Sequence, residues 1–237
     1  MNQTQNFKMQ SLVHTPTNDI KNSLEFYQKL EFKIVTDKTR TLVTDGKAVI
    51  EINPDRFARA GVKLFKKKWT KEVTRLKKLT VVHKTKEGFL LSDASNVWIY
   101  LVEGASNIKH KPTKTAFSVL GNYAGLSLES LDIARSVAIW KALGFETNGS
   151  PEQGWVACKN EDELMVNIMN PLMCPHLFFN PSLTYFNGKE NNPKVIKKIR
   201  SLKIPIMEEI THFNDKNIVD NVIIRDPGGY GFFIFND

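Results

Sequence analysis

The sequence predicts an α+β fold of four βαβββ modules (strand, helix, three strands), which form two open half-barrel sheets with the helices outside. The first observation is that the two halves of the 237-residue chain repeat each other in register. The second is that a helical stripe followed by strand signals occurs four times. The matched positions are separated by a constant 113 residues (132 − 19 = 113 and 145 − 32 = 113), and they pair Asp19, Ile20, Ser23, Tyr27, Leu30 and Phe32 with Asp132, Ile133, Ser136, Trp140, Leu143 and Phe145.

Four groups of apolar residues spaced i, i+4, i+7 predict four helices, each with one side against a sheet. Asp19 and Asp132 are placed to cap the first and third helices by accepting hydrogen bonds from free backbone amides. Pro193 fits the first turn of the fourth helix, where a missing N–H costs nothing. The apolar groups are Ile20, Leu24 and Tyr27; Trp69, Val73 and Leu76; Ile133, Val137 and Trp140; and Val195, Ile199 and Leu202.

One apolar segment before each helix and three segments after it are predicted to be strands. The leading strands are expected at 11–14, 62–65, 125–128 and 183–186. The following strands are expected at 32–36, 41–44 and 48–52; 80–83, 89–91 and 97–102; 145–147, 155–158 and 164–169; and 205–210, 219–224 and 231–235. Gly-containing pairs, among them Asp45-Gly46 and Asn148-Gly149, mark the expected hairpin turns.

The repeat predicts two domains of two modules each, at residues 1–104 and 116–237, joined by a linker at 105–115 that is rich in Lys, Ser and Asn. The modules can pair within each half or across the halves, and the sequence leaves both arrangements open. A monomer and a homodimer are both compatible with this organisation.

The composition indicates a globular protein that does not cross a membrane. No apolar run approaches the roughly 20 residues of a membrane span, and the N-terminal MNQTQNFK has no signal-peptide centre, so we expect a cytoplasmic protein. The net charge of +8 suggests an anionic partner. However, the basic run from Lys63 to Lys78 overlaps a helix with an apolar stripe, so its lysines are best interpreted as a solvated helix face, and nucleic acid is the less favoured partner. Cys158 and Cys174 form no disulfide framework and no metal motif.

The four modules resemble the vicinal oxygen chelate superfamily, which includes glyoxalase I, the bleomycin-resistance proteins and the extradiol dioxygenases. The resemblance is carried by two helix motifs and one turn, and it covers nearly the whole chain. The motif residues are Asp19-Ile20, Ser23, Phe26-Tyr27, Leu30 and Phe32; Asp132-Ile133, Ser136, Trp140 and Leu143-Gly144-Phe145; and Asp226-Pro227-Gly228-Gly229. These are scaffold motifs, so the resemblance predicts the fold and says little about the chemistry.

Metal-dependent members of that family hold a divalent ion with His, Gln or Glu on the first and last strands of a module. In the first module the resemblance places these positions at Leu12, two residues before His14 on the same strand face, and at Glu51. His14 and Glu51 are therefore the predicted metal ligands, with Tyr100 a poor third, and the other modules offer nothing comparable. Simpler roles are also open: His14 bonding a backbone group, Glu51 pairing with Lys63 or Arg59, and Tyr100 as a half-buried aromatic residue.

Three functions follow from these features. The favoured one is a protein that binds a small molecule in a sheet-lined concavity without a complete metal site, in the manner of the bleomycin-resistance proteins. The second is a metal-dependent lyase, isomerase or dioxygenase in which Glu51 is a ligand or a catalytic base. The third is a module for an anionic partner or nucleic acid. No cofactor is expected under the first function, and a divalent metal under the second. The residues predicted to line the pocket are His14, Tyr100, Trp98, Lys63, Tyr185 and Phe233.

Overall fold

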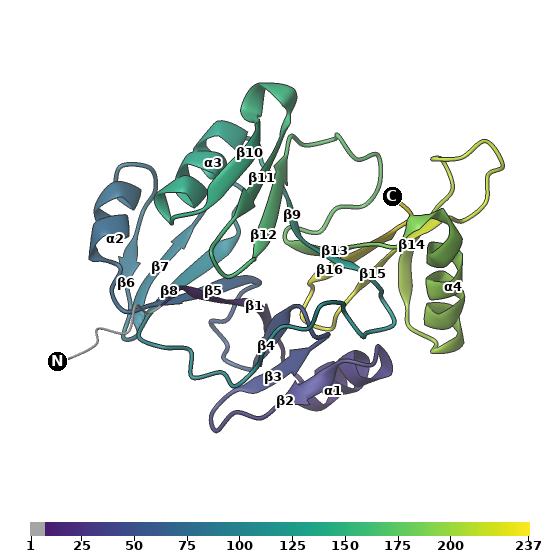
Figure 1. Cartoon of the computed structure of the whole chain (residues 1–237), viewed down its shortest axis with the longest axis horizontal. Helices are drawn as coiled ribbons and strands as arrows, with labels where there is room; N and C mark the ends of the chain where they lie inside the picture. The colour runs from purple at the N-terminus through teal and green to yellow at the C-terminus, as the bar shows by residue number, and fades with distance from the viewer. Residues whose placement is uncertain (1–7) are drawn as a thin grey trace.

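The computed structural model describes residues 8–237, and the two eight-stranded sheets with their four helices are seen in Figure 1. The expectation that the N-terminus is no signal peptide falls on residues that lie mostly outside this range. Among the described residues, no helix has both the length and the apolar character needed to span a membrane.

The first sheet is formed by residues 10–103 and has the strand order β2-β3-β4-β1-β5-β8-β7-β6. Its elements are β1 (Gln10–Pro16), α1 (Ile20–Lys29), β2 (Lys33–Val35), β3 (Thr41–Thr44), β4 (Val49–Asn53), β5 (Gly61–Lys66), α2 (Thr70–Leu76), β6 (His83–Lys84), β7 (Gly88–Ser92) and β8 (Trp98–Glu103). Residues 104–122, called here the connecting segment, lead to the second sheet.

The second sheet has the matching order β10-β11-β12-β9-β13-β16-β15-β14. Its elements are β9 (Tyr123–Glu129), α3 (Ile133–Ala142), β10 (Glu146–Ser150), a short 3-10 helix (Pro151–Gln153), β11 (Trp155–Lys159), β12 (Met165–Met169), β13 (Ser182–Phe186), α4 (Gly188–Ser201), β14 (Ile206–Ile210), β15 (Asn221–Arg225) and β16 (Gly231–Phe235). The predicted α+β fold of four βαβββ modules in two open sheets is confirmed.

The modules pair within each half. β1 lies antiparallel to β5 in the first sheet, and β9 lies antiparallel to β13 in the second. Each leading strand also runs parallel to the last strand of its own module, as β1 does to β4. The joint between two modules is therefore the centre of each sheet, and side chains from both modules meet there.

The repeat is exact at the first and third helices, because α1 and α3 each have ten residues and begin 113 positions apart (133 − 20 = 113). The Asp19 carboxylate accepts from the Asn22 N–H at 3.0 Å, and the Asp132 carboxylate accepts from the Arg135 N–H at 3.0 Å. Both predicted caps are thus confirmed, and they satisfy amides that the helix itself cannot.

Two local predictions are wrong. Pro193 is not in the first turn of α4, because the helix begins at Gly188. The buried amide of Asn192 donates to the Asp220 and Ile234 carbonyls and anchors the earlier turns to the sheet. The turn expected at 148–149 is instead part of β10, and the chain reverses over residues 151–154, where Gly154 takes a left-handed conformation with φ of 76°.

The main hydrophobic core is continuous between the two halves. Two buried aspartates connect the halves. Each lies in the last hairpin of its own module, and each contacts a helix in the other half of the chain. The Tyr27 hydroxyl of α1 donates to Asp226 at 2.7 Å, and the Trp140 indole of α3 donates to Asp93 at 3.0 Å. Because burial raises the pKa of both carboxyl groups, these donors compensate for the lost hydration.

Candidate functional site

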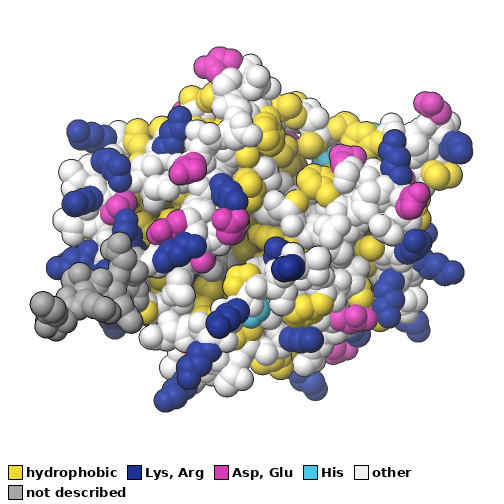
Figure 2. All heavy atoms as spheres, viewed as in Figure 1, with side chains coloured by type: hydrophobic (Ala, Val, Ile, Leu, Met, Phe, Trp, Pro, Cys, Tyr) yellow, Lys and Arg dark blue, Asp and Glu magenta, His cyan; other side chains and the backbone are white. Residues whose placement is uncertain are grey.

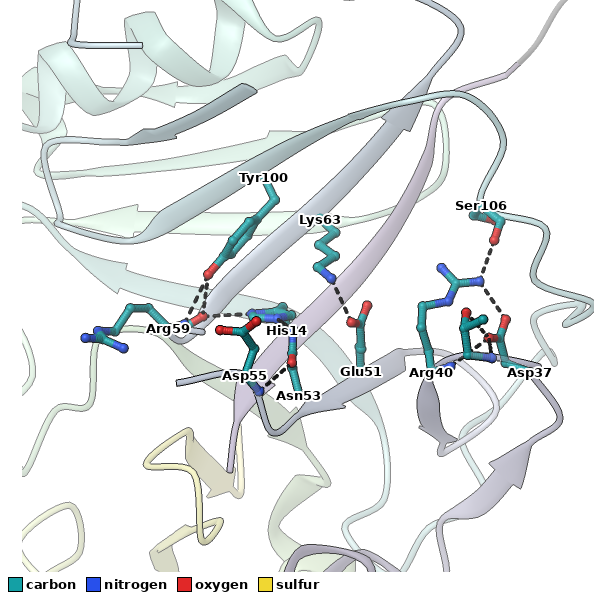
Figure 3. A network of polar contacts seen from close by, with 11 residues as sticks. His14, Asp37, Arg40, Glu51, Asn53, Asp55, Arg59, Lys63, Tyr100 and Ser106 are labelled. Atoms are coloured by element: carbon teal, nitrogen blue, oxygen red, sulfur yellow. Dashed lines mark hydrogen bonds and ion pairs between the residues drawn. The ribbon is translucent and has the colours of Figure 1, made fainter. Parts of the chain in front are cut away.

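Four neighbouring strands at the centre of the first sheet each direct one polar side chain to the same concave face (Figure 3). β1 supplies His14, β4 supplies Glu51, β5 supplies Lys63 and β8 supplies Tyr100. His14 is in register with Glu51, and Lys63 is in register with Tyr100. Since side chains alternate along a strand, their apolar neighbours point into the main core on the other face.

Lys63 and Glu51 form a buried ion pair. The Lys63 ammonium donates to Glu51 Oε1 at 2.7 Å, and the two residues are 9% and 4% exposed. Oε2 of Glu51 is also buried, and it has no hydrogen-bond partner among residues 8–237. Burying a carboxylate oxygen without a donor is costly, so this atom is the least satisfied polar group at the site. Of the simpler roles considered for Glu51, the pairing with Lys63 is confirmed.

His14 is fully buried, and both of its ring nitrogens are engaged by the protein. Nδ1 lies 2.8 Å from the Arg59 carbonyl, which requires this nitrogen to carry the proton. Nε2 lies 3.0 Å from the Asn53 amide nitrogen, so it accepts from that amide. Burial, and next the charge of Lys63, lower the pKa of His14 to about 4. His14 is therefore a neutral side chain with a defined tautomer at neutral pH.

The chain between β4 and β5 lies against the site through Arg59 (Figure 3). The Arg59 N–H donates to the Tyr100 hydroxyl at 3.1 Å, and the Arg59 guanidinium lies 5.8 Å from the centre of the Trp98 ring. Burial raises the pKa of Tyr100, so its phenol is neutral. Trp98 and Tyr100 are both partly exposed.

These residues do not fit a divalent metal ion. Such an ion needs several lone pairs that converge on it, whereas the ammonium of Lys63 occupies one oxygen of Glu51 and both nitrogens of His14 are already hydrogen-bonded. Within residues 8–237, no three His, Cys, Asp or Glu side chains lie close enough together to hold a metal. The structure brings the two predicted ligands together, but with their donor atoms committed to the protein.

The equivalent positions of the second sheet carry different chemistry. Ser127 and Asn167 are register partners, and they occupy the positions of His14 and Glu51. Thr184 and Phe233 are also register partners, and they occupy the positions of Lys63 and Tyr100. Ser127 and Thr184 are hydrogen-bonded to each other at 2.7 Å. Phe233 is buried against Phe178, from the loop before β13, so the predicted pocket residue Phe233 belongs to an apolar cluster in the other half.

Tyr185, another predicted pocket residue, lies in the protein core. It is fully buried in the main core, its ring stacks on Phe232, and its hydroxyl donates to Asp45 of the first half at 2.9 Å. Its neighbour Thr184 faces the concave side instead, because alternation sends the two side chains to opposite faces of β13.

Sequence reasoning missed the contribution of Asn53 and of the Arg59 backbone. Asn53 is two residues after Glu51, so it shares the face of that side chain, and this spacing is a signal that the sequence does contain. The Arg59 carbonyl has no such signal, because the path of a loop cannot be inferred from strand periodicity.

Comparisons with known proteins support the fold. No protein-family model matches the chain, and no curated protein sequence matches it. Solved structures match over nearly its full length. A catechol 2,3-dioxygenase matches with a TM-score of 0.55 at 12% identity, over 94% of this chain and 85% of that one. The homoprotocatechuate 2,3-dioxygenase of Arthrobacter globiformis matches with a TM-score of 0.56 at 14% identity, over 94% and 78% of the two chains.

The homoprotocatechuate 2,3-dioxygenase of Brevibacterium fuscum, solved with 3,4-dihydroxyphenylacetate, matches with a TM-score of 0.58 at 11% identity, over 98% and 83% of the two chains. These enzymes are extradiol dioxygenases, members of the vicinal oxygen chelate superfamily. The chain therefore shares the fold of these enzymes, with two eight-stranded sheets. At such low identity the likeness extends to the fold alone.

Proposed function

We propose that this protein binds a small aromatic hydroxy compound at the concave face of the first sheet, without a metal ion. The observation that carries the proposal is the buried Glu51 Oε2, which has no hydrogen-bond partner in the described part of the chain, although the Lys63 ammonium bonds the other oxygen of the same carboxylate. A ligand hydroxyl that donates to this oxygen would satisfy it, and because the oxygen is buried, the side chains that cover it must move aside for the ligand to reach it. Lys63 has three N–H donors and gives one to Glu51, so it can also donate to a second oxygen of the ligand.

Two partly exposed aromatic side chains at the site favour a flat ligand. Trp98 and Tyr100 are partly exposed, and their ring centres are 6.0 Å apart. Ligand sites typically combine such apolar walls with a few convergent polar groups. The solved dioxygenase that holds 3,4-dihydroxyphenylacetate has the same fold, which makes that compound a reasonable first probe.

The alternative is a metal-dependent lyase, isomerase or dioxygenase that uses His14 and Glu51, and the fold of the neighbouring dioxygenases supports it. It requires His14 to release a ring nitrogen and Lys63 to leave Glu51. The two functions therefore predict different metal contents and different responses to a chelator.

The test is calorimetric titration of 3,4-dihydroxyphenylacetate and catechol into protein purified without a metal-affinity tag, with and without EDTA. The metal content of the same sample is measured by elemental analysis. We expect less than about one tenth of a metal ion per chain, and binding that EDTA does not change. Glu51→Gln should weaken binding at least about tenfold, because it replaces a charged acceptor facing the ligand hydroxyl.

Asn167→Ala is the matched control, since Asn167 occupies the same register position in the second sheet. It should leave binding unchanged. One metal ion per chain together with EDTA-sensitive binding would support the metal-dependent alternative. Absence of binding by either probe would overturn the proposed ligand class.

A further inference from the structure

A groove of about 860 Å³ lies between the edge strand β2, the loop that follows it and the connecting segment. Its lining shares no residue with the site described above. Its volume is in the range of sites for small organic ligands. Its walls carry five basic side chains, namely Lys33, Lys38, Arg40, Lys109 and His110. Dark-blue side chains are prominent along the lower part of Figure 2, where β2, β3 and the connecting segment are found.

The acidic charge in the groove is already neutralised. Asp37 is the acidic residue of the lining, and it accepts from the Arg40 guanidinium at 2.7 Å and from the N–H groups of Thr39 and Arg40 at 2.9 Å. The hydrogen bond from the Arg40 side chain is the main reason that the pKa of Asp37 is held well below its usual range. Arg40 is also bonded to the Ser106 carbonyl of the connecting segment (Figure 3). Asp37 and Arg40 therefore form a fixed, locally neutral wall.

Lys33, Lys38 and Lys109 remain as uncompensated charges. All three are exposed, and in the described part of the chain none of them is within 4.0 Å of a carboxylate. The Lys33 ammonium lies 4.4 Å from the centre of the Phe117 ring, so this side chain extends from β2 to the connecting segment. Three ammonium groups around one groove, none paired with a carboxylate of the described residues, favour an anion, because each is a point charge suited to a phosphate oxygen.

Apolar surface accompanies this charge. Ile34 is 57% exposed at the sheet edge, and Phe117 lines the opposite wall. We propose that the groove binds a small organic phosphate, with its phosphate groups on Lys33, Lys38 and Lys109 and its organic part on Ile34 and Phe117. A long nucleic acid is less suited, because the charges surround a bounded groove and do not extend as a stripe along one face.

The test is calorimetric titration of the full-length protein with ATP and with inorganic tripolyphosphate. The groove variant is K33Q/K38Q/K109Q, and the matched control is K67Q/K68Q/K71Q, whose lysines are exposed at and beside α2. Both variants lower the net charge by the same amount, from +8 to +5 (8 − 3 = 5). Because exposed charge pairs are individually weak, we expect about a tenfold loss of ATP affinity for the groove variant, and less than about a twofold loss for the control.

Added salt should weaken the binding of both probes, since the contacts are exposed. Equal losses in the two variants would overturn the proposal, because they would assign the effect to net charge alone. Failure of the wild-type protein to bind either probe would overturn it as well. Binding of a single-stranded oligonucleotide that tripolyphosphate does not displace would assign the basic surface to nucleic acid instead.

Discussion

Replacing Lys63 by Met tests whether the centre of the first sheet depends on a buried ion pair. The substitution keeps an unbranched side chain in the same space and removes the ammonium group that lies 2.7 Å from Glu51 Oε1. Glu51 is 4% exposed, and its second oxygen has no partner among the residues that the structure describes, so these residues would leave the carboxylate without any donor. The variant therefore isolates the cost of an uncompensated buried charge.

The magnitude follows from the geometry. At 2.7 Å the attraction between the two charges is about 6 kcal/mol with an effective dielectric constant of 20, and desolvation of both groups offsets much of it. Removing one partner of a buried pair typically costs about 3 to 5 kcal/mol. We expect Lys63→Met to lower the free energy of unfolding by about 3 kcal/mol, measured by urea denaturation with tryptophan fluorescence.

Two further variants make the test sharp. Lys66→Met breaks a pair of the same 2.7 Å length with Glu72, but Lys66 is 36% exposed in its side chain, so the loss should stay below about 1 kcal/mol. The double variant E51Q/K63M removes the charge as well as its partner, and it should regain at least half of the loss caused by Lys63→Met. A loss below about 1 kcal/mol in Lys63→Met, or no recovery in the double variant, would refute the reasoning.

Two other predictions concern buried polar groups. The pKa of His14 is about 4 in the folded protein and about 6.5 when unfolded, so the unfolded chain takes up its proton first as the pH falls. The free energy of unfolding of the wild type should therefore drop by up to about 3 kcal/mol between pH 6.5 and 4, measured by urea denaturation at several pH values. The drop should be clearly smaller in His14→Gln. Parallel pH curves for the two proteins would contradict the low pKa of His14. Tyr27→Phe removes the hydroxyl that donates to buried Asp226 and should cost about 1 to 3 kcal/mol in thermal unfolding. The hydroxyl of Tyr123 is buried and has no partner within residues 8–237, so Tyr123→Phe should cost nothing, and equal effects of the two variants would argue against the Tyr27 contact.

The two halves have kept the same fold and diverged at the concave face. The first sheet places His14, Glu51 and Lys63 where the second has Ser127, Asn167 and Thr184. In the second sheet, Phe233 packs against Phe178 in an apolar cluster. The proposed ligand site is accordingly in the first half, which the sequence also favoured because it contains more polar candidates.

The sequence by itself determined the four modules, the positions of the helices and the two aspartate caps. These features depend on local spacing: a helix turns every 3.6 residues, and its first amides need an acceptor within three residues. The exact 113-residue offset between α1 and α3 shows how far such local rules extend. The same rules failed at Pro193, because a distant contact of Asn192 with the sheet extended α4 toward the N-terminus.

Only the tertiary structure decided how the modules pair, which charge meets which, and where Tyr185 lies. Both faces of a central strand such as β13 are buried, so its sequence does not reveal which face is the core and which is the concavity. The hydrogen-bond partners of His14 come from a loop and a neighbouring strand, and the partner of Glu51, Lys63, comes from another module. Contacts of this kind depend on strand register and loop path, which are set by the packing of the whole chain and are not encoded in any local pattern.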